Sequence, residues 1–341
     1  MVKRIVQIRP DAEPWLDIFS AARPGPQSKD QLGPSHVSQV GRTVSGAPEV
    51  MVKVTGGATS LGALRAHLKY ISRNGVQPVE TDGGESLKGR ESLESLMDDW
   101  HLDLSSGQYR RTRSGQAPPR SVKLVHHIVL SMPAPTPPDK VLAAARRFAR
   151  ERFGLEHRYA MVLHTDQRHP HAHLVVKSEG LHGRRLRIDK RTLRLWREDF
   201  AQYMREQGVP ANATPRAVRG ARRRKTLDPM LRAQRRGASW AMRQKVVEVA
   251  KQIANGSVFN EPGRAKLVET RKALVAGWIA VAKILDRQGE TQLAADVRKF
   301  VQEMPPVMTD KERLAYDYIQ SLKERITPKK PDPVRLPERT R

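Results

Sequence analysis

The chain has 341 residues and no cysteine. It can therefore form no disulfide, and any metal site must use nitrogen and oxygen ligands, a composition that fits a reducing cytosol. Aromatic residues make up only 5% of the sequence, which limits the base stacking available to a nucleic-acid-binding protein. The longest apolar run, residues 273–282, is about half of what spans a bilayer. We predict neither a secretory signal nor membrane insertion.

Two nucleotide- and ester-processing motifs are also missing. The sequence contains no G-K-[ST] phosphate loop and no G-x-S-x-G element, so neither an ATP-driven motor nor a serine hydrolase is indicated. Basic residues, in contrast, are in large excess: 62 Lys and Arg face 36 Asp and Glu, for a formal net charge of +26. A charge of this size favours a polyanionic partner, with nucleic acid ahead of an acidic membrane surface.

Composition and periodicity divide the chain into five regions. We predict a disordered leader (1–46), a folded domain (47–215), a basic linker (216–239), a helical domain (240–327) and an extended tail (328–341). In the folded domain, β-branched or apolar runs predict strands at 49–57, 122–131, 159–165 and 171–177, the first ended by its two glycines. Helices are predicted from Ser60 as N-cap, at 139–154 and at 190–207.

The stretch "HTDQRHPHAHLVVK" (164–177) concentrates histidines beside a strand. Alternate residues of a strand share a face, so His171 and His173 point the same way. A hairpin turn before them would lay His164 opposite the pair. Three neutral imidazoles leave coordination positions open, as in catalytic metal sites. His169 falls in the turn and is left out; Asp166 either accepts the second N–H of an imidazole or merely begins the turn.

The helix predicted after Ser60 carries a candidate nucleophile, Tyr70. At 100° per residue its apolar side chains fall within about 80° of one another, and Tyr70 lies near the opposite side of the helix. The apolar residues are Leu61, Leu64, Leu68 and Ile71. A tyrosine kept for packing would lie among the leucines, whereas an exposed tyrosine can form covalent intermediates.

Three motifs in order, "LRAHLKYISRNG", "HHIVLSMPAPT" and "HTDQRHPHAHLVV", resemble those of relaxases of mobilizable and conjugative plasmids. The similarity is greatest to the branch that includes the T-DNA border-nicking endonuclease, within the HUH endonucleases. It covers about residues 48–220. It implies an α+β fold with a central antiparallel sheet flanked by helices, and it does not extend to the helical domain predicted at 240–327.

The resemblance also assigns residues. It implies that Tyr70 attacks one DNA strand, that His164, His171 and His173 bind Mg²⁺ or Mn²⁺, and that Asp166 supports the site. His127 aligns with the middle motif without an assigned role. We assign DNA binding to Arg73 and to the basic run Arg222, Arg223, Arg224 and Lys225.

The implied partners are single-stranded DNA at an origin of transfer, accessory relaxosome proteins and a type IV secretion coupling protein. The implied location is the bacterial cytoplasm, with passage into the recipient cell alongside the DNA. Two alternatives stay open. A rolling-circle replication initiator shares the chemistry but usually places its histidines before its tyrosine. A non-catalytic basic nucleic-acid-binding protein would rely on the run at 222–225.

Overall fold

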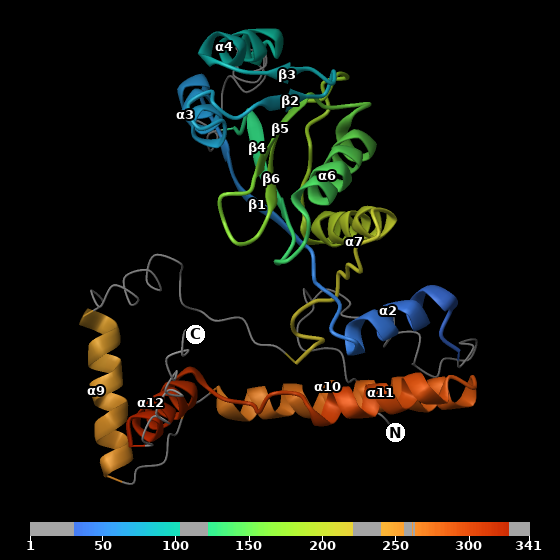
Figure 1. Cartoon of the computed structure of the whole chain (residues 1–341), viewed down its shortest axis with the longest axis vertical. Coiled ribbons are helices and arrows are strands. Elements are labelled where there is room, and N and C mark those ends of the chain that lie inside the picture. The colour runs from blue at the N-terminus through green and yellow to red at the C-terminus, as the bar shows by residue number, and fades with distance from the viewer. Residues whose placement is uncertain (1–30, 103–121, 221–239, 256–260, 262, 327–341) are drawn as a thin grey trace, which may run out of the picture.

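The computed structural model describes residues 31–102, 122–220, 240–255, 261 and 263–326 (Figure 1). A six-stranded antiparallel sheet of order β1-β4-β6-β5-β2-β3 forms the centre of an α+β domain, and a helical region follows it. This confirms the predicted fold class. The strands are β1 (Met51–Ala58), β2 (Val79–Thr81), β3 (Ser86–Leu87), β4 (Val125–Ser131), β5 (Tyr159–His164) and β6 (His171–Lys177). The domain's helices are α3 (Leu61–Ile71), α4 (Arg90–Asp99), α6 (Pro138–Phe153) and α7 (Lys190–Glu206).

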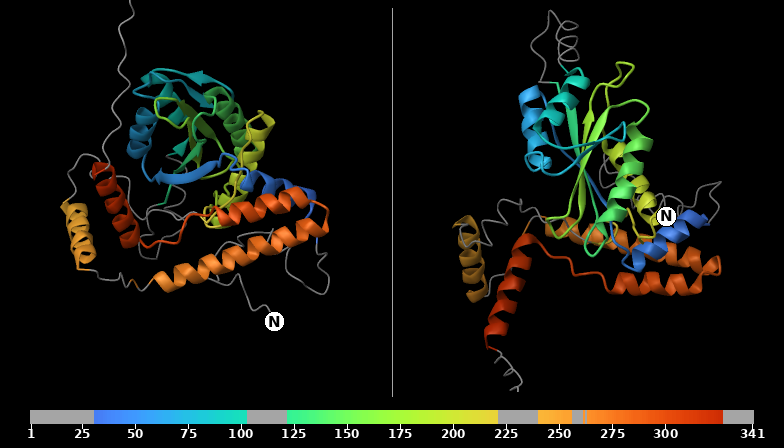
Figure 2. Two further views of the ribbon diagram at one scale, coloured as in Figure 1. Left: turned by 60° about the horizontal axis from the view of Figure 1, so that its bottom comes forward. Right: turned by 45° about the horizontal axis from the view of Figure 1, so that its top comes forward.

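Helices cover both faces of the sheet, as the right-hand view of Figure 2 shows. On one face α6 and α7 bury the side chains of Ala172, Leu174 and Val176 from β6. On the other face α3 and α4 share a second core with Val175 of the same strand. Because side chains alternate along a strand, His171 and His173 share the α3 side of the sheet with Val175. The predicted metal ligands of β6 therefore lie on the face of the sheet that α3 covers.

The two glycines of β1 lie inside the strand, so the prediction that they end it was wrong. β1 continues to Ala58 and pairs with β4 through a register shift between Val54 and Gly56. Gly57 packs against the β4 backbone so closely that a Cβ there would lie 2.3 Å from the carbonyl oxygen of Val125. Glycine is needed at position 57 because the two backbones approach closely there. Gly57 does not end the strand.

The adjacent glycines provide a matched stability test. We expect Gly57→Ala to lower the free energy of unfolding by about 2 kcal/mol, because the backbone of β4 must shift to admit the new Cβ. A Cβ on Gly56 would meet nothing within 4 Å, so Gly56→Ala should change stability by no more than about 0.5 kcal/mol. Urea denaturation followed by circular dichroism measures both. Equal losses in the two variants would contradict the close-contact explanation.

Part of the predicted leader is folded. Residues 1–30 lie outside the described part, but α2 (Pro34–Val44) is a helix, so the prediction of disorder was wrong for this stretch. Val40 is fully buried in one core with Trp278 and Leu285. The side-chain amide of Gln288 accepts a hydrogen bond from the backbone N–H of Leu32 and donates one to its carbonyl oxygen, each at 3.0 Å. Burial against a segment about 240 residues away stabilises a helix too short to form alone.

The C-terminal region is helical, as predicted. Its described helices are α9 (Trp240–Ala254), α10 (Arg264–Arg287), α11 (Thr291–Gln302) and α12 (Asp310–Ile326). α10 buries Leu274, Trp278, Val281 and Leu285, and Leu267 is partly exposed. Figures 1 and 2 show α10 and α11 lying together beside α2. None of the helices in the described part of the chain combines the length and apolarity of a bilayer span.

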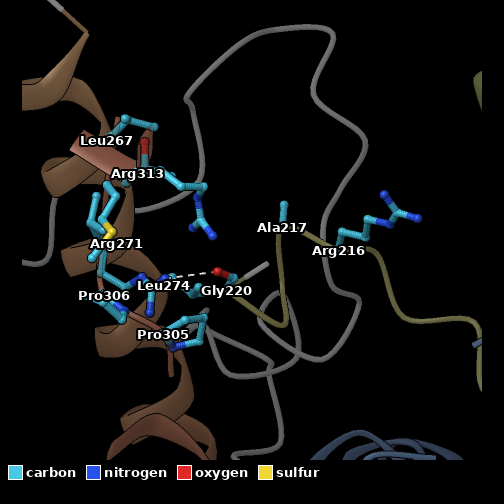
Figure 3. Close-up of a pocket in the computed structure, with 12 residues that line it drawn as sticks. Arg216, Ala217, Gly220, Leu267, Arg271, Leu274, Pro305, Pro306 and Arg313 are labelled. Atoms are coloured by element: carbon cyan, nitrogen blue, oxygen red, sulfur yellow. Dashed lines mark hydrogen bonds between the residues drawn. The ribbon is translucent and has the colours of Figure 1, made fainter. Parts of the chain in front are cut away.

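A cavity of about 300 Å³ lies where residues 216–220 meet α10 and the segment 305–308 (Figure 3). Arg271 crosses its wall and donates a hydrogen bond to the carbonyl oxygen of Gly220 at 2.9 Å. The indole N–H of Trp278 donates to the carbonyl oxygen of Val218 at 2.9 Å. These two bonds anchor the segment 216–220 to α10. The lining contains no residue of the predicted catalytic site.

Candidate active site

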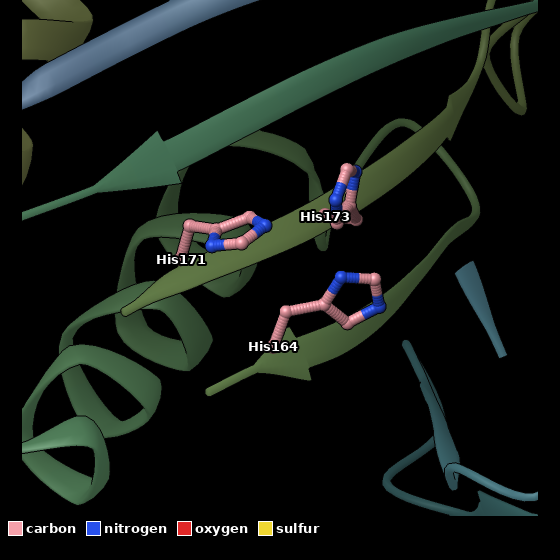
Figure 4. A group of neighbouring side chains, drawn as sticks. All are labelled: His164, His171 and His173. Carbon is pink, nitrogen blue, oxygen red and sulfur yellow. The ribbon is translucent and has the colours of Figure 1, made fainter. Parts of the chain in front are cut away.

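The β5–β6 hairpin brings three predicted histidines together (Figure 4). His164 pairs with His171 across the two antiparallel strands, and His173 follows on the same face. One ring nitrogen from each of the three lies within 4.8 Å of the others. The ring centroids are separated by 4.6–5.2 Å. The three imidazoles thus converge on one point, as the spacing H-x6-H-x-H predicts. We call His164, His171 and His173 the histidine triad.

Hydrogen bonds orient two rings of the triad. His164 donates from Nε2 to the carbonyl oxygen of Ile71 at 2.6 Å. Its Nδ1 atom is thereby left as the metal-ligating nitrogen, with Nη2 of Arg73 3.5 Å away. His171 donates from Nδ1 to the carbonyl oxygen of His169 at 2.9 Å, which leaves Nε2. The Nδ1 atom of His173 is buried and has no hydrogen-bond partner among the described residues. Ligating histidines usually donate their second N–H in this way, so the residues present fit a divalent metal ion.

Burial favours the neutral form of two members of the triad, His164 and His173. It lowers the pKa of His164, and it is also the main reason why the pKa of His173 falls to about 3, with further contributions from the neighbouring His164 and His171. An imidazole must be unprotonated to coordinate a metal. These side chains are therefore in the ligating form at neutral pH.

Tyr70 faces the triad from the end of α3. Ser60 caps the helix by accepting a hydrogen bond from the backbone N–H of Ala63, and burial of Leu64 and Leu68 fixes its rotation on the sheet. Tyr70 is left 58% exposed, with its ring centroid 6.5 Å from that of His173. The structure thus brings the predicted nucleophile and the predicted metal ligands side by side.

Asp166 has a different contact from the one predicted. The second N–H groups of His164 and His171 go to backbone carbonyls, and the carboxylate of Asp166 pairs with the guanidinium of Arg73. Desolvation is the largest single influence and acts to raise the pKa of Asp166. The charge and hydrogen bond of Arg73, a backbone hydrogen bond and the charge of His164 together outweigh it, so the pKa is lowered overall. The guanidinium carbon of Arg73 lies 5.5 Å from the ring centroid of Tyr70. Asp166 therefore acts on Arg73 and not on an imidazole.

Sequence reasoning missed His67. Its ring stacks on that of His127 at 3.5 Å between centroids and 6° between planes, and its centroid is 6.4 Å from that of Tyr70. Burial lowers the pKa of His67 and brings that of His127 to about 4. His67 precedes Tyr70 by three residues, so helical spacing alone would have placed both on one side of α3. The stacked pair fastens this side of the helix to β4.

The basic run Arg222, Arg223, Arg224 and Lys225 lies outside the described residues. Of the predicted DNA-binding residues, the structure therefore places Arg73 alone.

An antiparallel sheet that carries a histidine triad beside a helical tyrosine is the arrangement that the resemblance to relaxases predicts. Residues 81–209 match the family model "Relaxase: MobA/VirD2-like, nuclease domain". The matched segment contains the triad and begins after Tyr70. Residues 81–209 are thus similar to a VirD2-like relaxase domain, which confirms the resemblance over the second and third motifs.

The relatives are three proteins called T-DNA border endonuclease VirD2. That of Rhizobium radiobacter is 27% identical over 212 residues, which make up 58% of this chain and 48% of the relative. Those of Rhizobium rhizogenes and Agrobacterium fabrum are 28% and 27% identical over 186 residues, half of this chain and 42% and 41% of theirs. The matches thus span less than half the length of these relatives.

Proposed function

We propose that the protein is a site- and strand-specific DNA relaxase that nicks single-stranded DNA at an origin of transfer and starts conjugative transfer or plasmid mobilization. The observation that carries the proposal is the exposed Tyr70 with its ring 6.5 Å from His173 of the triad. The net charge of +26 supports a polyanionic substrate.

The proposed step is a transesterification. The phenolic oxygen of Tyr70 attacks the phosphorus, an O–P bond forms, and the bond from phosphorus to the 3′ oxygen breaks. The phenol proton is lost to water, and the 3′ oxygen gains a proton and leaves as a hydroxyl. One phosphate ester replaces another, so the reverse reaction can rejoin the strand without ATP. A chain that lacks the phosphate loop can therefore both break and reseal DNA.

His164, His171 and His173 are the residues that would hold Mg²⁺ or Mn²⁺. When bound, such an ion supplies a Lewis acid for the negative charge of a phosphate oxygen. The contribution of the chain is to keep three imidazoles on one face of the sheet and to hold Tyr70 beside them. The carbonyl oxygens of Ile71 and His169 fix the orientations of the His164 and His171 rings, respectively.

Trapping of the covalent intermediate tests the proposal. The full-length protein is incubated with Mn²⁺ and a pool of random-sequence single-stranded oligonucleotides, and SDS-resistant adducts are digested and analysed by mass spectrometry. We expect the nucleotide on the peptide that contains Tyr70, attached through a 5′ phosphate, and a 3′ hydroxyl on the released strand. Sequencing of the bound DNA identifies the cleavage site. DNA attached to another residue, or no adduct at all, would overturn the mechanism.

The proposal extends to partners and location. Origin DNA, accessory relaxosome proteins and a type IV secretion coupling protein are the expected partners. The bacterial cytoplasm is the expected location, and passage of the DNA-linked protein into the recipient cell is expected to follow.

The basic run at 222–225 should contribute binding energy without sequence information. Replacing Arg222, Arg223, Arg224 and Lys225 with glutamine should reduce the slope of log Kd against log salt by about 3, since about 0.7 counterions are released per phosphate of a single strand. Nicking should continue at saturating DNA. Fluorescence anisotropy at several salt concentrations gives the slope, and an unchanged slope would mean that these side chains do not contact phosphates.

A further inference from the structure

The guanidinium of Arg73 lies between the proposed nucleophile and the histidine triad. It lies over the Tyr70 ring, with its carbon 5.5 Å from the centroid, and its Nη2 atom is 3.5 Å from Nδ1 of His164. A phosphate that is attacked by Tyr70 and held at the triad must pass next to this group. Asp166, on the turn between β5 and β6, pairs with the same Nη2 atom.

Arg73 reaches this place from an unusual backbone conformation. Its φ is 52°, and Asn74 and Gly75 follow with φ of 60° and 87°. A left-handed conformation disfavours any residue with a Cβ, so a position needed only for the turn would suit glycine better. The ion pair with Asp166 offsets little of the cost of this backbone conformation. The side chains of Arg73 and Asp166 are 32% and 48% exposed, and exposed pairs add little stability. Neither the turn nor the ion pair explains an arginine here.

We propose that Arg73 is a catalytic residue that binds a non-bridging oxygen of the scissile phosphate, and that Asp166 is a positioning residue that holds the guanidinium. This inference rests on the proposed function. A guanidinium has five N–H donors in a planar fork that matches phosphate oxygens. Asp166 and His164 both contact the Nη2 atom, and within the described part of the chain no hydrogen bond engages the Nε and Nη1 donors, which can therefore meet the phosphate. Negative charge accumulates on those oxygens as Tyr70 attacks, so the contact strengthens in the transition state.

Single-turnover kinetics test the assignment, with the oligonucleotide recovered from the wild-type adduct as substrate. We expect Arg73→Gln to slow adduct formation about 100-fold and Arg73→Lys about 10-fold, because lysine keeps the charge and loses the fork. The control is Arg65→Gln, which removes an exposed arginine of α3 that pairs with Glu94. This control should react at the wild-type rate. A wild-type rate in Arg73→Gln would overturn the proposal.

Two further readouts separate a catalytic role from a structural one. A methylphosphonate at the cleaved linkage removes the charge that Arg73 is proposed to neutralise, so the rate ratio of wild type to Arg73→Gln should approach one on this substrate. Mn²⁺ affinity, measured by calorimetry, should match that of the wild type in Arg73→Gln. If Arg73→Gln lost Mn²⁺ binding as well as the rate of adduct formation, Arg73 would be a structural support of the triad, and the proposal would be wrong.

The role of Asp166 is tested in a double-mutant cycle. Asp166→Asn should slow adduct formation less than Arg73→Gln does, and it should cause no further loss when Arg73 is already glutamine. Independent, multiplicative losses would show that Asp166 does not act through Arg73. The proposed function fails in a different way, because it requires the wild type to form an adduct at Tyr70. A wild-type rate in Arg73→Gln leaves that adduct in place and removes this inference alone.

Discussion

Replacement of Tyr70 with phenylalanine is expected to abolish the SDS-resistant protein–DNA adduct and to leave binding of the uncleaved strand near its wild-type level. The substitution removes the attacking oxygen and keeps the ring, which is 58% exposed and supports no core packing. Loss of a covalent nucleophile should lower the rate of adduct formation by about 10⁴-fold or more. Denaturing gels of labelled oligonucleotide measure the adduct, and fluorescence anisotropy measures binding.

The matched control is Tyr316→Phe. Tyr316 lies on α12 and is 50% exposed, close to the exposure of Tyr70. This variant should form the adduct at the wild-type rate. Persistence of the adduct in Tyr70→Phe would exclude this tyrosine as the nucleophile, and loss of the adduct in both variants would show that the assay reports stability and not chemistry.

His173→Ala is expected to remove metal-dependent cleavage while the fold is preserved. His173 is the central member of the triad, with its ring centroid 4.6 Å from that of His164 and 5.1 Å from that of His171. Two imidazoles bind a divalent ion far more weakly than three, so Mn²⁺ affinity should fall by more than about 100-fold. Calorimetry measures the affinity, and gel assays over a range of Mn²⁺ concentrations measure cleavage.

His169→Ala is the control for the triad, because it changes a histidine of the same hairpin. The side chain of His169 accepts a hydrogen bond from the backbone N–H of Ala134, and only its backbone carbonyl contacts the triad. The alanine variant keeps that carbonyl and should retain Mn²⁺ binding. If His173→Ala bound Mn²⁺ as tightly as the wild type, the triad would not be the metal site.

The histidine triad and Tyr70 could be predicted because each depends on a local periodicity. The two-residue period of β6 places His171 and His173 on one face, and a short hairpin returns the chain to His164. The helical period of α3 puts its leucines on one side and Tyr70 on the other. Both patterns survive folding because burial of one face of each element enforces them.

Contacts between segments distant in sequence could not be predicted in this way. Asp166 meets Arg73 across 93 residues, and the left-handed turn that aims the arginine depends on the end of α3. His67 meets His127 across the gap between α3 and β4. The helix α2 carries only a short stripe of Val37, Val40 and Val44 at helical spacing, and it is stabilised by a core built mainly from α10 and α11. In each case the sequence lists the side chains, but only the tertiary packing decides which of them meet.

The hydrogen bond from His164 to the carbonyl oxygen of Ile71 links the histidine triad to the end of α3, which carries Tyr70. Ile71 directly follows Tyr70, so whatever fixes this imidazole also fixes the peptide unit next to the tyrosine. The position of the helix end is therefore coupled to that of the hairpin through this hydrogen bond. By thermodynamic reciprocity, a ligand that favours one orientation of His164 favours the matching position of Tyr70 by the same free energy.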